Sequence, residues 1–436
     1  MNAVRVSTRV ISAAIVTAVV HEGRSLSQVA PAALRELEIE RDRAFVQACT
    51  FGVLRHYRAL QARLASFMHK PLRRKDADLE ALSLIGLYQI EHMDVASHAA
   101  VSATVDAARE LDKEWACKLI NGVLRAALRK PLETNGPLDP RSEFPQWMLD
   151  SVRHDWPDDS RSIFEQSNTQ APLTLRINQQ RAAVAEYGAL LDAAGLAHVT
   201  GHHARSAIRL LAPTAVTVLP HFADGYVSVQ DEAAQLAAQI LAPAAGEHVL
   251  DACAAPGGKT AHLLEFAGNG LSLLAIDNSA TRLRRVAENL ARLSLRCTVV
   301  AADACEPSSW WDGRLFDKIL CDAPCSALGV MRRHPDIRLR RTAADVQEIG
   351  TQQRRLLHAL WPLLAVDGRL LYATCSILRV ENDDVIDTLL AAQPTAEVLP
   401  LPFTAGHPTR HGRQILPGDN DMDGFYYCLL SKRAPG

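Results

Sequence analysis

Several kinds of sequence feature are absent from this chain of 436 residues, and each absence excludes a class of protein. No apolar run is long enough to cross a membrane, so we expect no membrane-bound protein. The nine cysteines include no CxxC pair and the 16 histidines have no metal-ligand spacing, which argues against a disulfide framework and against a metal site. No low-complexity tract or repeat is present. The sequence therefore predicts an ordinary soluble protein of the reducing cytoplasm.

The formal net charge of −2 conceals an asymmetry between the two parts of the chain. Residues 1–130 carry 19 Lys and Arg against 14 Asp and Glu, whereas the remainder carries 28 against 35. A modest basic excess is usually a solvated surface. Here it gives weak support for an anionic partner, since phosphate contacts need clusters of cations.

Apolar spacing and breaker residues divide the chain into three regions. Up to residue 135, apolar residues recur at helical spacing and Gly and Pro are scarce, which predicts an all-α domain. The segment 131–145 holds four prolines and a glycine and is interpreted as a linker. Residues 145–235 mix strand and helix patterns and predict a small α+β module. The strands expected there are 174–178, 207–211 and 226–230, and the helix is 181–194.

From residue 236 to 436 a strand, a glycine loop and a helix alternate, which predicts a parallel, doubly wound α/β domain of the Rossmann-like kind. We expect the strands 248–253, 272–277, 297–302, 317–322 and 369–374, with the helices 282–293, 345–364 and 381–391. The segment GFYYCLLSK near the end would add a last, antiparallel strand.

Two cysteines follow predicted buried strands, Cys325 after KILCDAP and Cys375 in RLLYATC. The ends of parallel strands are where open α/β sheets hold ligands. A free cysteine is commonly a small core residue. Two cysteines that each follow a strand and each precede a serine are better explained as catalytic residues. A thiolate is a strong nucleophile and can also take up a proton.

The segment VLDACAAPGGKT at 249–260 is predicted to be a strand, a tight loop and the start of a helix. Such a loop lets backbone approach a ligand and points helix N–H groups at it. Asp277 ends the next strand, where a carboxylate can accept both ribose hydroxyls. Asp303 follows the third strand and could accept from an adenine amino group. These features describe a nucleoside cofactor without requiring a phosphate.

A phosphate-binding NTPase is an alternative, since GGKT and the later KILCD imitate its two motifs. However, Cys253 stands where the first glycine of GxxxxGK[ST] is required, and Pro256 stiffens a loop that would have to wrap a phosphate. The dinucleotide motif GxGxxG is absent as well.

In combination, DACAAPGGKT, Asp277, Asp303, DAPCSALGVMRRHPDI and YATCSI resemble the RNA cytosine-C5 methyltransferases that use S-adenosyl-L-methionine. DEAAQLAA at 231–238 and DGFYYCLL at 423–430 are similar to flanking motifs of that family. The helical N-terminal part resembles the NusB fold, an RNA-binding module. The fusion is similar to bacterial enzymes that act on 16S rRNA, and the resemblance implies cytosine 967 as the target.

The resemblance also implies roles for individual residues. Cys375 would be the nucleophile at C6 of cytosine, Cys325 the base that removes the C5 proton, and Asp322 and Lys259 would lie beside the base. The cofactor-binding residues that the resemblance implies are Cys253, Ala254, Ala255, Pro256, Gly257, Gly258, Lys259, Asp277, Arg282, Asp303 and Asp322. The five arginines of 331–341 predict contacts with the RNA backbone.

Two other functions stay open at this point. The chain could methylate cytosine C5 in another RNA, or it could be a non-catalytic RNA-binding or ribosome assembly factor with a NusB-like domain. Intact thiols and an intact cofactor loop argue against the second, since a binding module needs neither. We expect a monomer that binds free 16S rRNA or an early small-subunit particle, with no metal.

Overall fold

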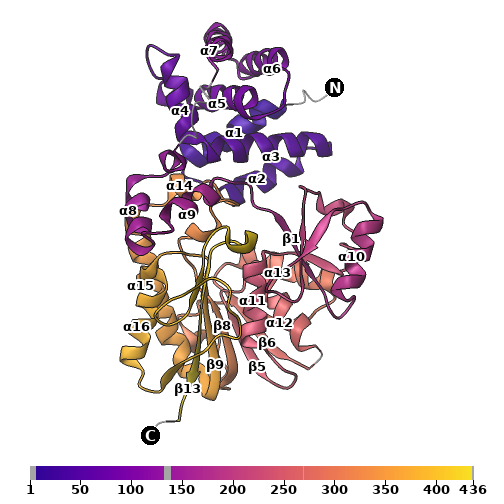
Figure 1. Cartoon of the computed structure of the whole chain (residues 1–436), viewed down its shortest axis with the longest axis vertical. Helices are drawn as coiled ribbons and strands as arrows, with labels where there is room; N and C mark the ends of the chain where they lie inside the picture. Colours follow the sequence, from indigo (N-terminus) through magenta and orange to yellow (C-terminus); the bar gives the residue numbers. More distant parts are fainter. Residues whose placement is uncertain (1–5, 132–138, 269, 435–436) are drawn as a thin grey trace. The chain divides into compact units, whose positions relative to one another are not determined.

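The computed structural model describes residues 6–131, 139–268 and 270–434, and its contacts divide the chain into two units (Figure 1). The first, here called the helical unit, comprises Met1–Arg153, Asp158–Asn168 and Met331–Arg341. The second, the sheet unit, comprises His154–Pro157, Thr169–Val330 and Thr342–Gly436. No helix within the described ranges has both the length and the apolar character that crossing a bilayer requires.

The helical unit is built around one almost completely buried helix, α5 (Ala77–His92). Leu82, Leu84, Ile85 and Leu87 are each 0% exposed, because α5 packs against α1, α3, α4, α6 and α7 on different sides. The predicted all-α domain is confirmed. The helical unit also contains α1 (Thr8–Val20), α2 (Leu26–Arg35), α3 (Glu40–Arg55), α4 (Tyr57–Ser66), α6 (Ser97–Glu110) and α7 (Cys117–Arg129), together with α9 (Ser160–Ser167) from beyond the predicted domain.

The arginine-rich segment Met331–Arg341 also belongs to the helical unit, with the short helix α14 (Ile337–Arg340). The Arg338 guanidinium is 1% exposed and donates hydrogen bonds to the carbonyl oxygens of Arg55 (3.2 Å) and Ser167 (2.8 Å) and to the Asn168 amide oxygen. It also lies 4.3 Å from the Phe144 ring centroid. The prediction of an RNA backbone contact is wrong for Arg338, because its charge is used inside the fold.

The predicted linker at 131–145 lies partly outside the described residues, since 132–138 are not among them. Its last part forms a 3₁₀ turn, Pro140–Glu143, and Asp139 accepts the backbone N–H of Arg141 at the start of that turn. Helix α8 (Gln146–Asp155) follows.

The small α+β module is a four-stranded antiparallel sheet in the order β2-β3-β1-β4, and it is part of the sheet unit. The predicted strands are present as β1 (Leu173–Ile177), β3 (Ala207–Leu210) and β4 (Val227–Val229), with helix α10 (Val184–Ala193). Strand β2 (His198–Thr200) was not predicted, because a three-residue edge strand has almost no apolar alternation to detect.

The main sheet has five parallel strands in the order β9-β8-β5-β6-β7. They are β5 (His248–Ala252), β6 (Ser272–Asp277), β7 (Thr298–Ala301), β8 (Phe316–Asp322) and β9 (Leu364–Thr374). The predicted last strand, β13 (Phe425–Lys432), pairs antiparallel with β9 as expected. Three short strands that the sequence did not predict extend this edge: β10 (Ala396–Leu399), β11 (His407–Pro408) and β12 (Arg413–Ile415).

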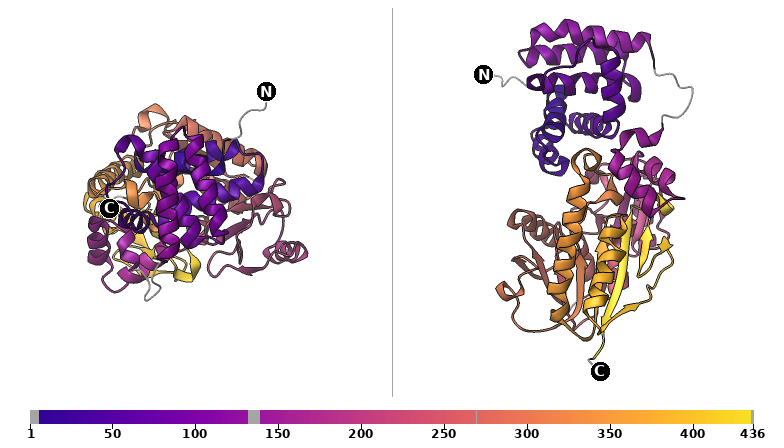
Figure 2. Two further views of the ribbon diagram at one scale, coloured as in Figure 1. Left: turned by 90° about the horizontal axis from the view of Figure 1, so that it is seen from above. Right: turned by 90° about the vertical axis from the view of Figure 1, so that its left-hand side faces the viewer.

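Helices cover both faces of the main sheet, which confirms the doubly wound prediction (Figure 1). One face packs against α11 (Glu232–Leu241), α12 (Gly258–Ala267) and α13 (Ala280–Leu293), and the other against α15 (Ala343–Leu360) and α16 (Asp383–Ala392). The right-hand view of Figure 2 shows the orange helices α15 and α16 in front of the strands. Neighbours on one strand alternate between the two cores: Val249 packs on the first face and Leu250 on the second.

Candidate active site

The two predicted catalytic thiols meet where β8 and β9 end. These strands are parallel neighbours, with Asp322 opposite Ala373, so the loops that follow them emerge side by side. Cys325 Sγ lies 3.3 Å from Cys375 Sγ, within hydrogen-bonding distance for sulfur. The hydrogen bond with Cys375, together with burial, raises the pKa of the Cys325 thiol well above its ordinary value. Cys325 therefore holds its proton more tightly than an ordinary thiol does.

Backbone contacts hold two loops against each other: the loop after β8, which carries Cys325, and the loop after β9, which carries Cys375. These are called the two cysteine loops below. The Gly329 N–H donates to the Cys375 carbonyl oxygen at 2.9 Å, and the Gly424 N–H donates to the Gly329 carbonyl oxygen, also at 2.9 Å. A Cβ atom on residue 329 would lie 2.2 Å from the Gly424 oxygen and 2.8 Å from the Cys375 oxygen. Glycine is required at position 329 because three stretches of backbone converge there.

Lys259 and Asp322 form an ion pair beside the thiols, with Nζ 2.7 Å from Oδ2. Burial by itself would lower the pKa of the Lys259 ammonium, but the Asp322 carboxylate, with further contributions from Cys375 and Asp251, raises that pKa above its ordinary value. The ammonium also lies 5.0 Å from the Phe425 ring centroid. Lys259 is thus a fixed cation at the ends of β5 and β8, and it favours negative charge nearby.

The predicted cofactor loop joins β5 to α12, and its backbone lies close to β6 and α13. Gly257 begins α12 with a left-handed backbone (φ +95°), and a Cβ there would lie 3.0 Å from the Cα of Val286. The Ala254 N–H donates to the Ile276 carbonyl oxygen at 2.9 Å, and Asn289 donates to the Pro256 carbonyl oxygen at 3.0 Å. The Ala255–Pro256 peptide bond is cis. The loop is held from the neighbouring strand β6 and from α13.

The two predicted acidic strand ends differ in environment. Asp277 is 3% exposed and accepts from the Ala255 N–H (3.2 Å), the Ser279 N–H (2.9 Å) and Arg282 Nη2 (2.9 Å). It therefore connects the cofactor loop to the start of α13. Asp303 is exposed and accepts from the Cys305 N–H at 2.8 Å. The structure places Asp277 and Arg282 together and Asp303 one strand further along the same edge.

The charges at this edge fit a nucleoside with a positively charged sulfur better than a nucleotide. Both predicted cations, Lys259 and Arg282, are already paired with Asp322 and Asp277. Asp251, at 0% exposure, accepts from the Thr260 hydroxyl at 2.6 Å, and burial raises the pKa of its carboxyl to about 7. Carboxylates accept hydroxyl and amino groups and attract a sulfonium, whereas they repel phosphate. The residues present fit S-adenosyl-L-methionine.

Cys253 adopts a left-handed conformation in the loop (φ +66°), and burial raises the pKa of its thiol. Among the described residues it has no second thiol as a hydrogen-bonding partner, and we assign it to loop geometry.

Sequence reasoning missed a buried arginine that supports the cofactor loop. Arg176 of β1 forms an ion pair with Glu265 (Nη2 to Oε1, 2.8 Å), and both side chains are almost completely buried. Its Nη1 donates to the Gly258 carbonyl oxygen at 2.6 Å and to Gln230. The small module is thereby attached to the first residue of α12. A charged residue inside the apolar pattern TLRIN was the available signal.

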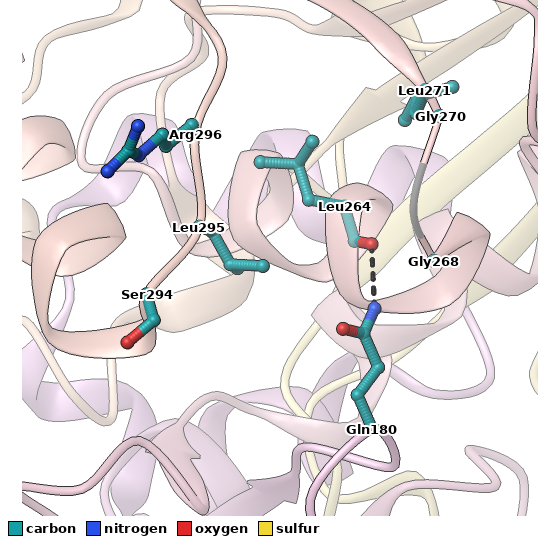
Figure 3. Close-up of a pocket in the computed structure, with 8 residues that line it drawn as sticks. All are labelled: Gln180, Leu264, Gly268, Gly270, Leu271, Ser294, Leu295 and Arg296. Carbon is teal, nitrogen blue, oxygen red and sulfur yellow. Dashed lines mark hydrogen bonds between the residues drawn. The ribbon is translucent and has the colours of Figure 1, made fainter.

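A hollow of about 240 Å³ lies at another place in the sheet unit (Figure 3). Gln180 donates to the Leu264 carbonyl oxygen within it, and Arg296 is its one charged lining residue. None of the predicted site residues lines this hollow, so it is distinct from the site at the strand ends.

Family models match three consecutive parts of the chain. Residues 6–129 match the NusB family, 144–217 match an RsmF/B-like ferredoxin-like domain, and 238–431 match 16S rRNA methyltransferase RsmB/F. The matches follow the order of the helical domain, the small module and the doubly wound domain.

Whole-chain relatives carry one common description. Ribosomal RNA small subunit methyltransferase B of Pseudomonas putida is 45% identical over 98% of this chain and 98% of its own length. The protein of that description from Vibrio cholerae is 43% identical, again over 98% of each chain.

Solved structures agree on the fold. A methyltransferase homolog from Pyrococcus horikoshii, 27% identical, superposes with a TM-score of 0.60 over 68% of this chain and 99% of its own. NSun6 of Pyrococcus horikoshii, solved with SFG, gives a TM-score of 0.62 over 67% of this chain and 99% of its own, and at 20% identity it supports the fold alone. From the family models and the whole-chain relatives together, the chain belongs to the 16S rRNA methyltransferase RsmB/F family, with S-adenosyl-L-methionine as the methyl donor.

Proposed function

We propose that the chain methylates carbon 5 of one cytosine in 16S rRNA through a covalent bond between Cys375 and C6 of the base. The observation that carries this proposal is the thiol pair, with two sulfur atoms 3.3 Å apart at the ends of adjacent parallel strands. A methyl transfer to a ribose hydroxyl or to an exocyclic amine needs no thiol. Two thiols match a reaction with one addition and one elimination.

Cys375 acts first. Its thiolate forms a bond to C6, and the electron pair of the C5–C6 double bond moves to C5, which becomes nucleophilic. S-adenosyl-L-methionine supplies an electrophilic methyl group for C5 and leaves as S-adenosyl-L-homocysteine. Without the addition at C6, C5 of cytosine is too electron-poor to attack a sulfonium methyl group at neutral pH.

Cys325 acts second. Once the Cys375 sulfur is bonded to carbon, its negative charge is gone, and so is the main cause that raises the pKa of the Cys325 thiol. Cys325 then releases its proton to solvent, and its thiolate takes the proton from C5. The C–H electron pair restores the C5–C6 double bond, and the Cys375 thiolate is expelled.

Asp322 and Lys259 assist at the edge of the base. In this proposal Asp322 accepts a hydrogen bond from the N4 amino group at the N3/N4 edge of the base, and the ion pair with Lys259 orients its carboxylate. In the cofactor site, Asp277 and Asp303 are assigned the ribose and adenine groups. The backbone of 253–258 would pass along the cofactor, and Arg282 holds the Asp277 carboxylate in place.

The three parts of the chain divide the work in this proposal. Residues 1–135 and 145–235 supply RNA affinity, and 236–436 binds the cofactor and carries out the chemistry. The substrate is cytosine 967, presented by free 16S rRNA or an early small-subunit particle to a cytoplasmic monomer. The target base must leave its stack to reach the thiols.

Replacing each thiol in turn tests the proposal. Cys375→Ser should abolish methyl transfer, since no bond to C6 forms. Cys325→Ser should form the bond but not release it, which leaves a protein–RNA complex that survives denaturant on a gel. Cys253→Ser is the matched control and should turn over without trapping. A trapped complex with Cys375→Ser would reverse the two roles, and none with either variant would remove the covalent mechanism.

A further inference from the structure

One buried carboxylate, Glu381, binds the loops that carry both thiols. It ends the 3₁₀ turn Arg379–Glu381 after β9 and is 0% exposed. Its oxygens accept from the Ser326 N–H (2.6 Å), from the Ser326 hydroxyl (2.5 Å) and from the Ser376 hydroxyl. Ser326 and Ser376 directly follow Cys325 and Cys375. The same side chain therefore fixes the residue next to each sulfur.

The backbone of Glu381 is itself held in place. The Tyr372 hydroxyl, on β9, donates to the Glu381 carbonyl oxygen at 2.7 Å. The next residue, Asn382, accepts from the Thr374 hydroxyl at 2.6 Å and donates to the Ser376 carbonyl oxygen at 3.2 Å. The turn after β9 thus folds back on the strand, which carries the carboxylate to the neighbouring loop after β8.

Joining two loops through a buried carboxylate carries a large cost in free energy. Removing a charged group from water costs several kcal/mol, and well-packed apolar residues are commonly as stable or more so. What a carboxylate adds is strong, directional acceptance of several donors at once. With three donors from two loops on one group, neither loop can shift without breaking a charge-assisted hydrogen bond.

We propose that Glu381 is a positioning residue that sets the distance and orientation of Cys325 relative to Cys375. The inference rests on the proposed function, in which one thiol adds to C6 and the other serves C5 of the same base. Two neighbouring ring atoms must be reached by two sulfur atoms from different loops, and a displacement of about 1 Å in such a site can reduce the rate about 100-fold.

The charge of Glu381 has a second consequence, for the protonation of Cys325. After the hydrogen bond with Cys375, burial and the charge of Cys375, the negative charge of Glu381 further raises the pKa of the Cys325 thiol. In the proposed mechanism, Cys325 therefore holds its proton until the addition at C6 has occurred, so that Cys375 and not Cys325 is the nucleophile.

The test compares Glu381→Gln with Asp383→Asn, which neutralises another buried carboxylate two residues later. Asp383 is 4% exposed and accepts from the Tyr426 hydroxyl and from the backbone N–H groups of Arg410 and His411, so it contacts neither cysteine loop. Each variant is assayed on 16S rRNA at a temperature where circular dichroism shows it folded. Affinity for S-adenosyl-L-methionine is measured by calorimetry.

We expect Glu381→Gln to lower kcat about 10- to 100-fold while cofactor affinity and KM for RNA change less than about twofold. Asp383→Asn should change kcat less than about twofold. Glu381→Asp keeps the charge but shortens the side chain, so it should lower kcat as well. Equal kcat losses in Glu381→Gln and Asp383→Asn would mean that Glu381 only stabilises the fold, and would overturn the proposal.

A second readout needs no methyl transfer. In chains that also carry Cys375→Ser, the alkylation rate of Cys325 is followed against pH by mass spectrometry of its peptide. Glu381→Gln should move the profile to lower pH, because a negative charge that raises the Cys325 pKa is gone, whereas Glu381→Asp and Asp383→Asn should leave it in place. An unmoved profile in Glu381→Gln contradicts the proposal, even if Glu381→Gln is too unstable for the kcat assay.

The two proposals fail separately. If Cys325→Ser traps no RNA, the covalent mechanism is wrong, yet the alkylation profiles still decide whether Glu381 acts on Cys325. If trapping succeeds and Glu381→Gln behaves like Asp383→Asn in both assays, the mechanism stands and the positioning role is wrong.

Discussion

Each cysteine of the proposed thiol pair is followed by a segment with a buried charged side chain, and the two side chains differ in the residues that they hold. The segment 331–341 after Cys325 is packed in the helical unit, where Arg338 donates to neutral acceptors of that unit. The segment 376–382 after Cys375 stays in the sheet unit, where Glu381 accepts from both cysteine loops. The Arg338 side chain stabilises the helical unit, whereas the Glu381 side chain joins the two loops of the candidate site.

The comparison shows that charge density in a sequence is a poor guide to the site. Five arginines within eleven residues indicated an RNA contact, yet Arg338 among them is 1% exposed. No sequence pattern pointed to Glu381, although its side chain connects the two cysteine loops. Burial and the identity of the partners decide what a charge does, and neither is visible in composition.

The largest effect expected from this comparison concerns Arg338. Arg338→Met keeps the apolar stem but leaves three acceptors, at Arg55, Ser167 and Asn168, without this donor. At about 1–3 kcal/mol for each buried unpaired group, the helical unit should lose about 3 kcal/mol or more. Amide hydrogen exchange should become faster in α3 and α9, whereas the exchange rates in β9 should not change.

The matched control for Arg338 is Arg125→Met, which removes an exposed arginine of the same unit. It should change stability by less than about 0.5 kcal/mol. Comparable losses in the two variants would mean that net charge, and not the buried hydrogen bonds, holds the helical unit together.

A smaller effect is expected at Gly329, where the Cys325 loop begins to leave the sheet unit. Gly329→Ala places a methyl group 2.2 Å from the Gly424 oxygen, so the backbone carrying Cys375 must move. We expect kcat to fall about 100-fold with cofactor affinity unchanged. Gly122→Ala, with nothing within 4 Å of the added Cβ, should have wild-type kcat. Wild-type kcat in Gly329→Ala would show that the loops tolerate displacement.

The smallest effect is a shift in a thiol titration. Cys375 is the main cause that raises the Cys325 pKa, through a hydrogen bond and through charge. In Cys375→Ser the Cys325 pKa should therefore fall toward its ordinary value, and alkylation of Cys325 should begin at lower pH than in the wild type. Cys253→Ser serves as the control with no change. A shift to higher pH would mean that the two sulfur atoms do not share a proton.

Much of the fold followed from local pattern. Each predicted strand of the parallel sheet is present within a few residues, because each is a short, mainly apolar run bounded by loops. The antiparallel last strand followed from GFYYCLLSK in the same way. Strands β2, β10, β11 and β12 were not predicted, since strands of two to four residues carry too little alternation.

The candidate site was predicted in part. The strand-end rule placed Asp277 and Cys375 at one edge of the sheet, because parallel strands expose their carboxyl ends together, and the resemblance added Asp322. The resemblance grouped Lys259 with Asp322, and the structure joins the two in an ion pair. Arg176 and Glu381 were missed, because their partners lie 89 and 55 residues away along the chain.

By itself the sequence determined the helical N-terminal domain, the doubly wound sheet, the cofactor loop and the two thiols, since each depends on residues close together in the chain. Only the tertiary structure decided that the sulfur atoms lie 3.3 Å apart, that Arg338 is internal and that one carboxylate binds both loops. The physical reason is that hydrogen bonds and burial depend on which segments meet in space. Strand order brings β8 and β9 together although α14 and α15 lie between them in the chain, and no local pattern specifies the atoms that then come into contact.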